Sequence, residues 1–300
     1  MSEIPIRLRE AADRAGLQNL SVISENPRKG RWCLTGRDLL GKKCFIKWNE
    51  PEKKSFYLAF QREKKIYEFL CGSGSAPEAE PLGEELLVTE LMDSSATLRS
   101  VLMNSGRRSE HLRCVKLAHA AYRDFLNAVA EHAQELAAFD RSCGETFGKI
   151  EYEEQYDRHL RQLYISGPMD APINRLERKI NSFRLSAARR MVKARPVKHS
   201  DRSACRYIHG DLHLNNFMID ETAERAVLID FEDTTEGCPE IELAYFEVQA
   251  ELLLRDEREE LLACRRNFDE VFSGMIDREL FESIRKDYAK AIACNRRFQK

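Results

Sequence analysis

The sequence lacks the residue spacings of common metal and redox sites. Its nine cysteines stand singly, with no Cys-x-x-Cys pair and no histidine spacing typical of zinc. We therefore expect reduced, mostly buried thiols in a cytoplasmic protein. An excess of charge of one sign is also missing, because the formal net charge is -2. This near balance gives no general electrostatic footprint for nucleic acid or for a membrane surface.

Long apolar runs and glycine-rich loops are scarce as well. No run approaches the roughly 18 apolar residues of a membrane span, and residues 1–20 are charged without the apolar core of a secretory signal. The glycine pair Gly72 and Gly74 is not followed by the Gly-Lys-Ser/Thr of a Walker loop. With 43% hydrophobic residues in 300, the chain can nevertheless bury a sizeable core, as one two-lobed unit or as two domains.

The most informative segment is residues 207–233, which reads YIHGDLHLNNFMIDETAERAVLIDFED. Two apolar runs, 217–219 and 227–229, flank a polar stretch of hairpin-loop length, so the pattern predicts an antiparallel hairpin. Asn216 stands just before the first strand and Asp230 just after the second. A hairpin would bring both to the same end.

These two side chains suit a magnesium ion. One carboxylate and one amide oxygen are a sufficient protein contribution for a hard cation that keeps waters and substrate phosphates as its other ligands. Asp211 precedes Asn216 by five residues and lies on the loop before the hairpin. There it can face a hydroxyl group, orient it and accept its proton during phosphoryl transfer.

The segment resembles the catalytic and metal loops of the aminoglycoside phosphotransferase and choline kinase superfamily. Its first loop, His-Gly-Asp, four variable residues and Asn, is matched by His209, Gly210, Asp211 and Asn216. Its second loop, Ile-Asp with an acid three residues later, is matched by 229–233, and Ile-Asp-Phe-Glu is similar to the choline kinase version. The resemblance implies a structural role for His209. It leaves His213 without a role, and it leaves Glu232 and Asp233 as candidates for a second cation or a basic acceptor.

The resemblance also implies a lysine for the nucleotide phosphates and a glutamate that fixes it. Lys47 lies in the predicted strand 43–48, and Glu63 lies mid-helix in 55–70, where apolar residues recur at helical spacing. Glu68 is an alternative on the same helix. The turn 25–31, between predicted strands 20–24 and 32–35, would cover the phosphates, unless it is an ordinary basic hairpin turn. Gly30 is its one glycine, and Lys29 or Arg31 could add positive charge there.

A nucleotide-base site is implied further along the chain. The apolar strand 85–92 resembles the last strand of the small lobe and the hinge after it, so backbone groups of Glu90, Leu91 and Met92 would meet the adenine. Residues 112–139 carry apolar residues at helical spacing and predict one long scaffold helix.

Two features bear on the acceptor and point in opposite directions. A basic block of arginines and lysines in 175–198 reads as a solvated helix face or as a site for an anionic partner. The helix expected at 237–251 has Glu242-Leu243-Ala244 where the family more usually has Asp-Leu-Ala. Its other acids, Glu236, Glu240, Glu247 and Glu251, would suit a cationic acceptor unless they are ordinary exposed glutamates.

The resemblance thus implies an α+β, bilobal protein-kinase-like fold. Residues 1–92 would form a nucleotide-binding lobe with a small antiparallel sheet, and 93–300 a mainly helical lobe with an insertion at about 145–203. The implied activity is transfer of the γ-phosphoryl group of ATP, or of GTP, with Mg2+, to a hydroxyl of an aminoglycoside, choline-like or sugar acceptor. The alternatives are a protein kinase and a non-catalytic nucleotide-binding scaffold. The oligomeric state is left open.

Overall fold

The computed structural model describes residues 4–80, 85–92, 95–104, 106, 108–143, 150–163, 206–222 and 224–294. The chain divides into two compact units that each collect separate stretches of sequence. The first unit consists of Met1–Leu98, Leu117–Gly148 and Asn216–Thr234, and the second of Arg99–Lys116, Lys149–Asn215 and Thr235–Lys300. The predicted boundary at residue 92 stays a prediction.

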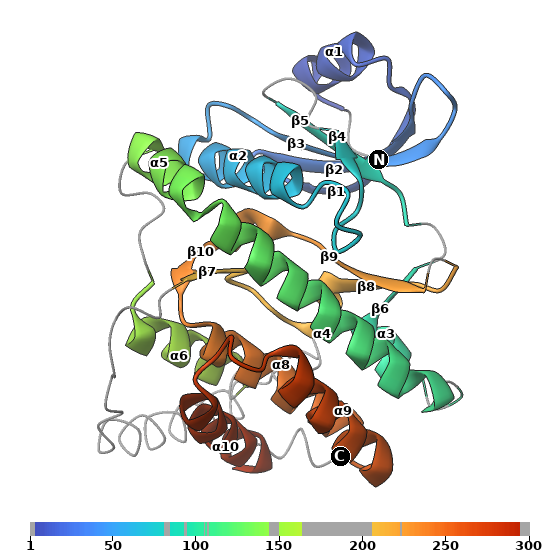
Figure 1. Ribbon diagram of the computed structural model, residues 1–300. Coiled ribbons are helices and arrows are strands. Elements are labelled where there is room, and N and C mark those ends of the chain that lie inside the picture. The colour runs from blue at the N-terminus through green and yellow to red at the C-terminus, as the bar shows by residue number, and fades with distance from the viewer. Residues whose placement is uncertain are drawn as a thin grey trace, which may run out of the picture. The chain divides into compact units, whose positions relative to one another are not determined.

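A five-stranded antiparallel sheet dominates the first unit (Figure 1). Its strands follow the order β1-β2-β3-β5-β4, so β3 lies at the centre. Their bounds are β1 (Gln18–Asn26), β2 (Arg31–Arg37), β3 (Lys43–Asn49), β4 (Ala79–Glu80) and β5 (Leu86–Glu90). The strands predicted at 20–24, 32–35 and 43–48 are therefore present.

Alternation along β3 separates the hydrophobic core from the polar site. Ile46 and Trp48 point to one face, where they pack with Leu8 and Ala12 of α1 (Ile6–Arg14) and with β2 and β5. Because successive side chains point to opposite faces of a sheet, Lys47 lies on the other face. There it meets α2 (Lys54–Phe69), which carries Glu63.

A second, smaller sheet completes the polar side of this unit. β8 (Phe217–Asp220) and β9 (Arg225–Leu228) form the predicted antiparallel hairpin, and β6 (Ala96–Thr97) adds a third strand beside β8. The short helix η6 (Phe231–Asp233) follows the hairpin and packs against α2. Phe231 is fully buried between Tyr67 and Phe125, with ring centroids 5.0 and 5.6 Å away.

The long helix predicted over 112–139 is divided. α4 (Arg108–Glu131) ends before His132, and α5 (Ala133–Cys143) begins directly after it. The apolar spacing continues from Leu117 to Leu136 across this point, and no Pro or Gly lies between these two residues. At the break the His132 ring stacks on Phe69 of α2 at 4.1 Å. This tertiary contact gives no pattern in the local sequence.

The second unit is mainly helical around a two-stranded sheet. β7 (Arg206–Ile208) pairs with β10 (Thr235–Gly237), and α8 packs against α10 (Figure 1). Its α-helices are α3 (Leu98–Met103), α6 (Tyr152–Arg161), α8 (Pro239–Leu253), α9 (Arg258–Val271) and α10 (Arg278–Cys294). The short helix η5 (Leu214–Asn216) lies just before β8. The predicted α+β class is confirmed. No described helix has the length and apolar character that crossing a membrane requires.

Seven described cysteines are free thiols, but they are not mostly buried. Cys44, Cys114 and Cys264 are buried, whereas Cys71 is exposed and the remaining three are intermediate. Burial raises the pKa of the Cys264 thiol to about 12, so this thiol stays protonated and unreactive.

Candidate active site

The first unit contains a pocket of about 350 Å³ that gathers most of the predicted nucleotide and metal residues. The predicted residues that line it are Lys47, Glu63, Glu90, Leu91, Met92, Asn216 and Asp230. Gly30 is absent from this lining. It sits in the turn before β2 with a φ of 63°, in the left-handed region that favours glycine. Glycine at this position therefore allows the backbone conformation of the turn, and any contact of Gly30 with phosphate stays a prediction.

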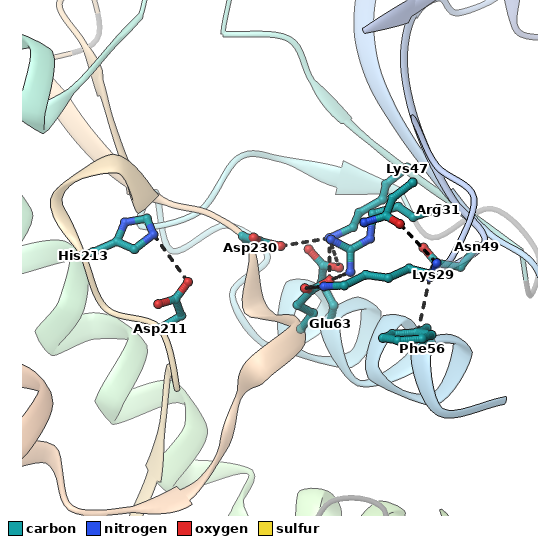
Figure 2. Close-up of polar contacts among 11 residues, drawn as sticks. Lys29, Arg31, Lys47, Asn49, Phe56, Glu63, Asp211, His213 and Asp230 are labelled. Carbon is teal, nitrogen blue, oxygen red and sulfur yellow. Dashed lines mark hydrogen bonds and ion pairs between the residues drawn. The ribbon is translucent and has the colours of Figure 1, made fainter. Parts of the chain in front are cut away.

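Lys47 stands at the centre of the polar end of this pocket (Figure 2). Its Nζ lies 2.7 Å from the Glu63 carboxylate and 2.9 Å from Asp230 Oδ1. Lys47 and Glu63 are buried, while the side chain of Asp230 is 40% exposed. The strand and the helix thus fix one buried ion pair, and a more accessible carboxylate borders it on the solvent side.

Two carboxylates lie within hydrogen-bond distance of Lys47 and decide its charge state. Burial by itself would lower the pKa of Lys47, but Glu63 and Asp230 outweigh it and raise the pKa above the ordinary value, so the ammonium stays charged. Burial raises the pKa of Glu63, and nearby Asp230 adds to the rise although Lys47 opposes it. Glu63, Asp230 and Glu232 have carboxylate oxygens within 4.8 Å of one another. Such a group of hard oxygen donors fits a divalent cation.

The hairpin brings the two predicted metal ligands to the same end. The backbone N–H of Ile229 donates to the carbonyl of Asn216 at 3.0 Å, which ties the start of β8 to the residue before Asp230. Asp230 itself has a φ of 64°. Asp is one of the few non-glycine residues that tolerate this left-handed conformation, which is uncommon elsewhere and is often found at functional sites.

The other end of the pocket is apolar and suits a flat ring. Phe45, Met218 and Ile229 are apolar residues of the lining, and Leu91 and Met92, directly after β5, add to it. The N–H of Glu90 already donates to the carbonyl of Glu78 at 2.9 Å. A ligand beside this segment would share the carbonyls of Glu90 and Met92, which accept the Thr89 hydroxyl at 3.3 Å and the N–H of Ser95 at 3.1 Å, or bind the other backbone groups of Leu91 and Met92.

The second unit holds the predicted base, Asp211, in a tightly fixed loop. Gly210 has a φ of 86°, which glycine accommodates without strain. The buried carboxylate of Glu242, on α8, accepts the N–H groups of His209 at 3.1 Å and of Gly210 at 2.5 Å. His209 Nδ1, fully buried, accepts the N–H of Asp211 at 3.3 Å. Glu242, which stands where the family more usually has Asp, thus anchors this loop to α8.

Histidines surround the carboxylate of Asp211. His213 Nε2 lies 3.4 Å from Asp211 Oδ2, and the side chain of Asp211 is 31% exposed (Figure 2). Burial raises the pKa of Asp211, but the interactions with His213, His209 and His159 outweigh it and hold the pKa below the ordinary value. The group is therefore ionised at neutral pH, so it can accept a hydrogen bond from a hydroxyl and receive its proton.

The acids expected near an acceptor are largely occupied by protein contacts. Glu240 and Glu247 are 3% exposed, and Glu240 accepts the N–H of Asp277 at 2.8 Å. Glu251 pairs with Arg285 at 2.8 Å. None of these three glutamates is exposed, and Glu236 is half-buried in β10. Contact with a cationic acceptor stays a prediction. The basic block in 175–198 and most of the insertion at 145–203 lie outside the described residues.

Cys33 and Tyr67 line the pocket but were not predicted from the sequence, whereas Arg31 was expected only as added charge near the phosphates. Cys33 lines the pocket because β2 pairs Cys33 with Lys47, and that register depends on tertiary structure. Arg31 reaches the same face two residues earlier and is ion-paired with Glu232. Tyr67 follows Glu63 by one helical turn. The i, i+2 and i, i+4 relations would have selected these residues once Lys47 and Glu63 were fixed.

Comparisons with known proteins place the chain in a family. Residues 28–265 match the model of the phosphotransferase enzyme family, APH. No curated protein shows a significant match to the sequence. Among solved structures, the amicoumacin kinase hAmiN, in complex with AMP-PNP, Ca2+ and Ami, is similar with a TM-score of 0.56 at 12% identity, over 98% of this chain and 92% of that one.

Two further structures are similar at comparable levels. Aminoglycoside phosphotransferase APH(3'')-Id from Streptomyces rimosus ATCC10970, in complex with ADP and streptomycin, gives a TM-score of 0.56 at 14% identity, over 97% of this chain and 99% of that one. Macrolide 2'-phosphotransferase type I gives 0.50 at 16% identity, over 96% and 90%. At these identities the likeness establishes the protein-kinase-like fold.

The fold and the family match together define a kinase-like phosphotransferase, which confirms the predicted class of enzyme with an alcohol group as acceptor. The chain belongs to the phosphotransferase enzyme family, whose model spans most of its length.

Proposed function

We propose that this protein transfers the γ-phosphoryl group of ATP, or of GTP, to a hydroxyl of a small molecule, with Mg2+ as the metal. The observation that carries the proposal is one pocket whose lining combines the buried Lys47–Glu63 ion pair, Asn216 and Asp230 with apolar residues such as Leu91 and Met92. A polar end for phosphates and an apolar slot for a base are what a nucleoside triphosphate requires.

Each residue has a role that follows from its surroundings. Lys47 stays charged and would bind the phosphates, while Glu63 holds its ammonium in place. Asn216 and Asp230 offer the oxygens that would hold the metal. A bound divalent cation supplies charge neutralisation for the phosphate oxygens. The three clustered carboxylates of Glu63, Asp230 and Glu232 support a cation there on grounds of charge alone.

Asp211 would act on the acceptor. Because its carboxylate is ionised, it would orient the attacking hydroxyl and accept the proton that leaves as the oxygen–phosphorus bond forms. Glu242 and His209 keep the backbone of this loop fixed, so the carboxylate does not have to reorganise during transfer.

The related structures support a small-molecule acceptor. They include proteins named for aminoglycosides, macrolides and amicoumacin, and one was solved with streptomycin. We therefore favour aminoglycoside, choline-like and sugar hydroxyls as the acceptor classes for this chain. Residues 1–92 would serve mainly nucleotide binding and residues 93–300 catalysis and acceptor binding, in a protein that works in the cytoplasm.

The test is nucleotide turnover with magnesium against a panel of aminoglycosides, choline, ethanolamine, sugars and protein acceptors. We expect acceptor-dependent product with the native protein and a loss of about 10²-fold or more in the variant Asp211→Asn. Asp13→Asn, on the exposed side of α1, is the matched control and keeps full activity. Transfer to protein acceptors alone would favour a protein kinase instead.

A further inference from the structure

The carboxylate of Glu232 neutralises three cations, of which Arg31 and Lys47 line the nucleotide pocket. Its oxygens are ion-paired with Arg31, lie 3.4 Å from Lys47 Nζ and lie 3.6 Å from Lys29 Nζ. The side chain of Glu232 is only 11% exposed, so solvent screens these interactions weakly. One carboxylate of η6 therefore holds three basic side chains from β3 and from the turn and strand around residue 30.

Arg31 has more donor capacity than Glu232 uses. Its guanidinium lines the pocket, and its Nε is buried without a hydrogen-bond partner. A guanidinium offers five N–H donors in a planar fork that matches a phosphate or a carboxylate. A buried donor without an acceptor is unfavourable, and a pocket that admits an anion can supply the missing acceptor.

Arg31 stands beside a turn that lacks the glycine-rich sequence of a phosphate-binding loop. The turn between β1 and β2 carries Gly30 as its one glycine and does not provide a glycine-rich stretch of N–H groups for phosphates. Lys29, in that turn, lies 5.6 Å from the Phe56 ring centre and is half-exposed, whereas the side chain of Arg31 is 17% exposed (Figure 2). Of these two cations, Arg31 is the more firmly fixed in the pocket wall.

We propose that Arg31 binds the phosphates of the nucleotide, and that Glu232 occupies Arg31 in the nucleotide-free protein and is exchanged for phosphate on binding. The inference rests on the proposed function, because it assumes a nucleoside phosphate in this pocket. Polyphosphates carry several negative charges against the single charge of Glu232, and bidentate Arg–phosphate pairs are among the strong hydrogen bonds. The exchange is therefore favourable, but it reduces the net affinity by whatever the Glu232 contacts contribute.

This account predicts opposite effects for the two partners. Glu232→Gln removes the competing anion and its repulsion of phosphates, so the metal-free affinity for ADP rises about fivefold to tenfold. Arg31→Met lowers that affinity about tenfold or more. In the double variant the gain from Glu232→Gln largely disappears, because the glutamate then has no arginine to occupy.

The experiment is calorimetric titration with adenosine, AMP, ADP and ATP in the presence of EDTA. Divalent metal is left out because Glu232 also belongs to the carboxylate group with Glu63 and Asp230, and metal binding would obscure the exchange. Glu10→Gln and Arg9→Met, exposed on α1, are matched controls with unchanged affinity. The deficit of Arg31→Met should be absent for adenosine and grow with the number of phosphates.

The outcomes separate this inference from the proposed function. A native protein that binds none of the four ligands, and not GTP either, with or without metal, would overturn both. A native protein that binds ADP, with an Arg31→Met affinity equal to the native one or a deficit that is the same for adenosine, would overturn only the inference. If Glu232→Gln fails to fold, the phosphate series with Arg31→Met still decides the role of the arginine, and Glu232→Asp repeats the exchange test with a shorter carboxylate.

Discussion

Removing the lysine at the centre of the pocket should destabilise the protein in a pH-dependent way. Lys47→Met deletes the ammonium that lies 2.7 Å from the Glu63 carboxylate, and both side chains are at least 94% buried. Removing one partner of a buried ion pair costs about 3 to 5 kcal/mol of unfolding free energy. Asp230 is 40% exposed, and Glu232 keeps Arg31 and Lys29, so the cost falls mainly on Glu63.

The pH dependence follows from the proton that Glu63 would take up. Burial already raises the pKa of Glu63, and the loss of Lys47 raises it further above the value in the unfolded chain. Between these two pKa values the folded variant binds more protons than the unfolded chain, so its unfolding free energy falls as pH rises. The slope is about 1.4 kcal/mol per pH unit at most. The deficit of Lys47→Met relative to the native protein should therefore be larger at pH 8 than at pH 5.

Urea unfolding at several pH values measures this effect, and the double variant Lys47→Met, Glu63→Gln is its control. With the uncompensated carboxylate gone, the double variant should regain most of the lost stability and lose the extra pH dependence. A Lys47→Met protein whose unfolding free energy stays within about 1 kcal/mol of the native value at every pH would refute the reasoning, because removing one partner of a buried ion pair costs more than that.

Three further predictions concern residues outside the nucleotide contacts. Glu242 accepts the N–H groups of His209 and Gly210, and Glu242→Gln replaces one of these acceptor oxygens by an NH2 donor. We expect the unfolding free energy in urea to fall by about 2 to 3 kcal/mol and the turnover to decrease. Glu259→Gln, at an exposed position of α9, should change neither. Arg62→Met removes the fully buried guanidinium that donates to the metal-loop backbone and pairs with Asp140, and it should cost about 3 kcal/mol or more in thermal unfolding; an unchanged melting temperature would contradict this. Burial lowers the pKa of His159 to about 4, so between pH 6.5 and 4 the unfolded chain binds more protons than the folded one, and the unfolding free energy decreases as the pH is lowered. His159→Phe should flatten that part of the stability profile. A variant that keeps the native slope would exclude this histidine as its cause.

The strands and the hairpin of the site could be predicted because local patterns determine them. Alternation over 43–48 placed Lys47 on a strand, and the two apolar runs around 220–225 predicted the hairpin that the structure contains. Register could not be predicted, since it depends on which strand lies beside which. The pairing of Cys33 with Lys47 is an example, and it decides that Arg31 shares the pocket.

Longer-range packing explains the predictions that were wrong. The helix expected over 112–139 is interrupted at His132, where the ring stacks on Phe69, a residue more than sixty positions away in the chain. The interpretation of the α8 acids as ordinary exposed glutamates is wrong for Glu240 and Glu247, which are buried, and Glu240 accepts the N–H of Asp277. Their role towards a cationic acceptor stays a prediction. Charge alone does not reveal burial, because a buried glutamate and a solvated one look the same in sequence.

The most direct test of the account follows the label of the nucleotide. The native protein, with magnesium and the acceptor panel, is incubated with ATP labelled either at the γ-phosphorus or at the α-phosphorus, and the acceptors are then separated and counted. The account predicts that the γ label, and not the α label, appears on one class of small-molecule acceptor and is lost with Asp211→Asn. If the native protein binds ATP but neither label reaches any acceptor, the result would contradict the account.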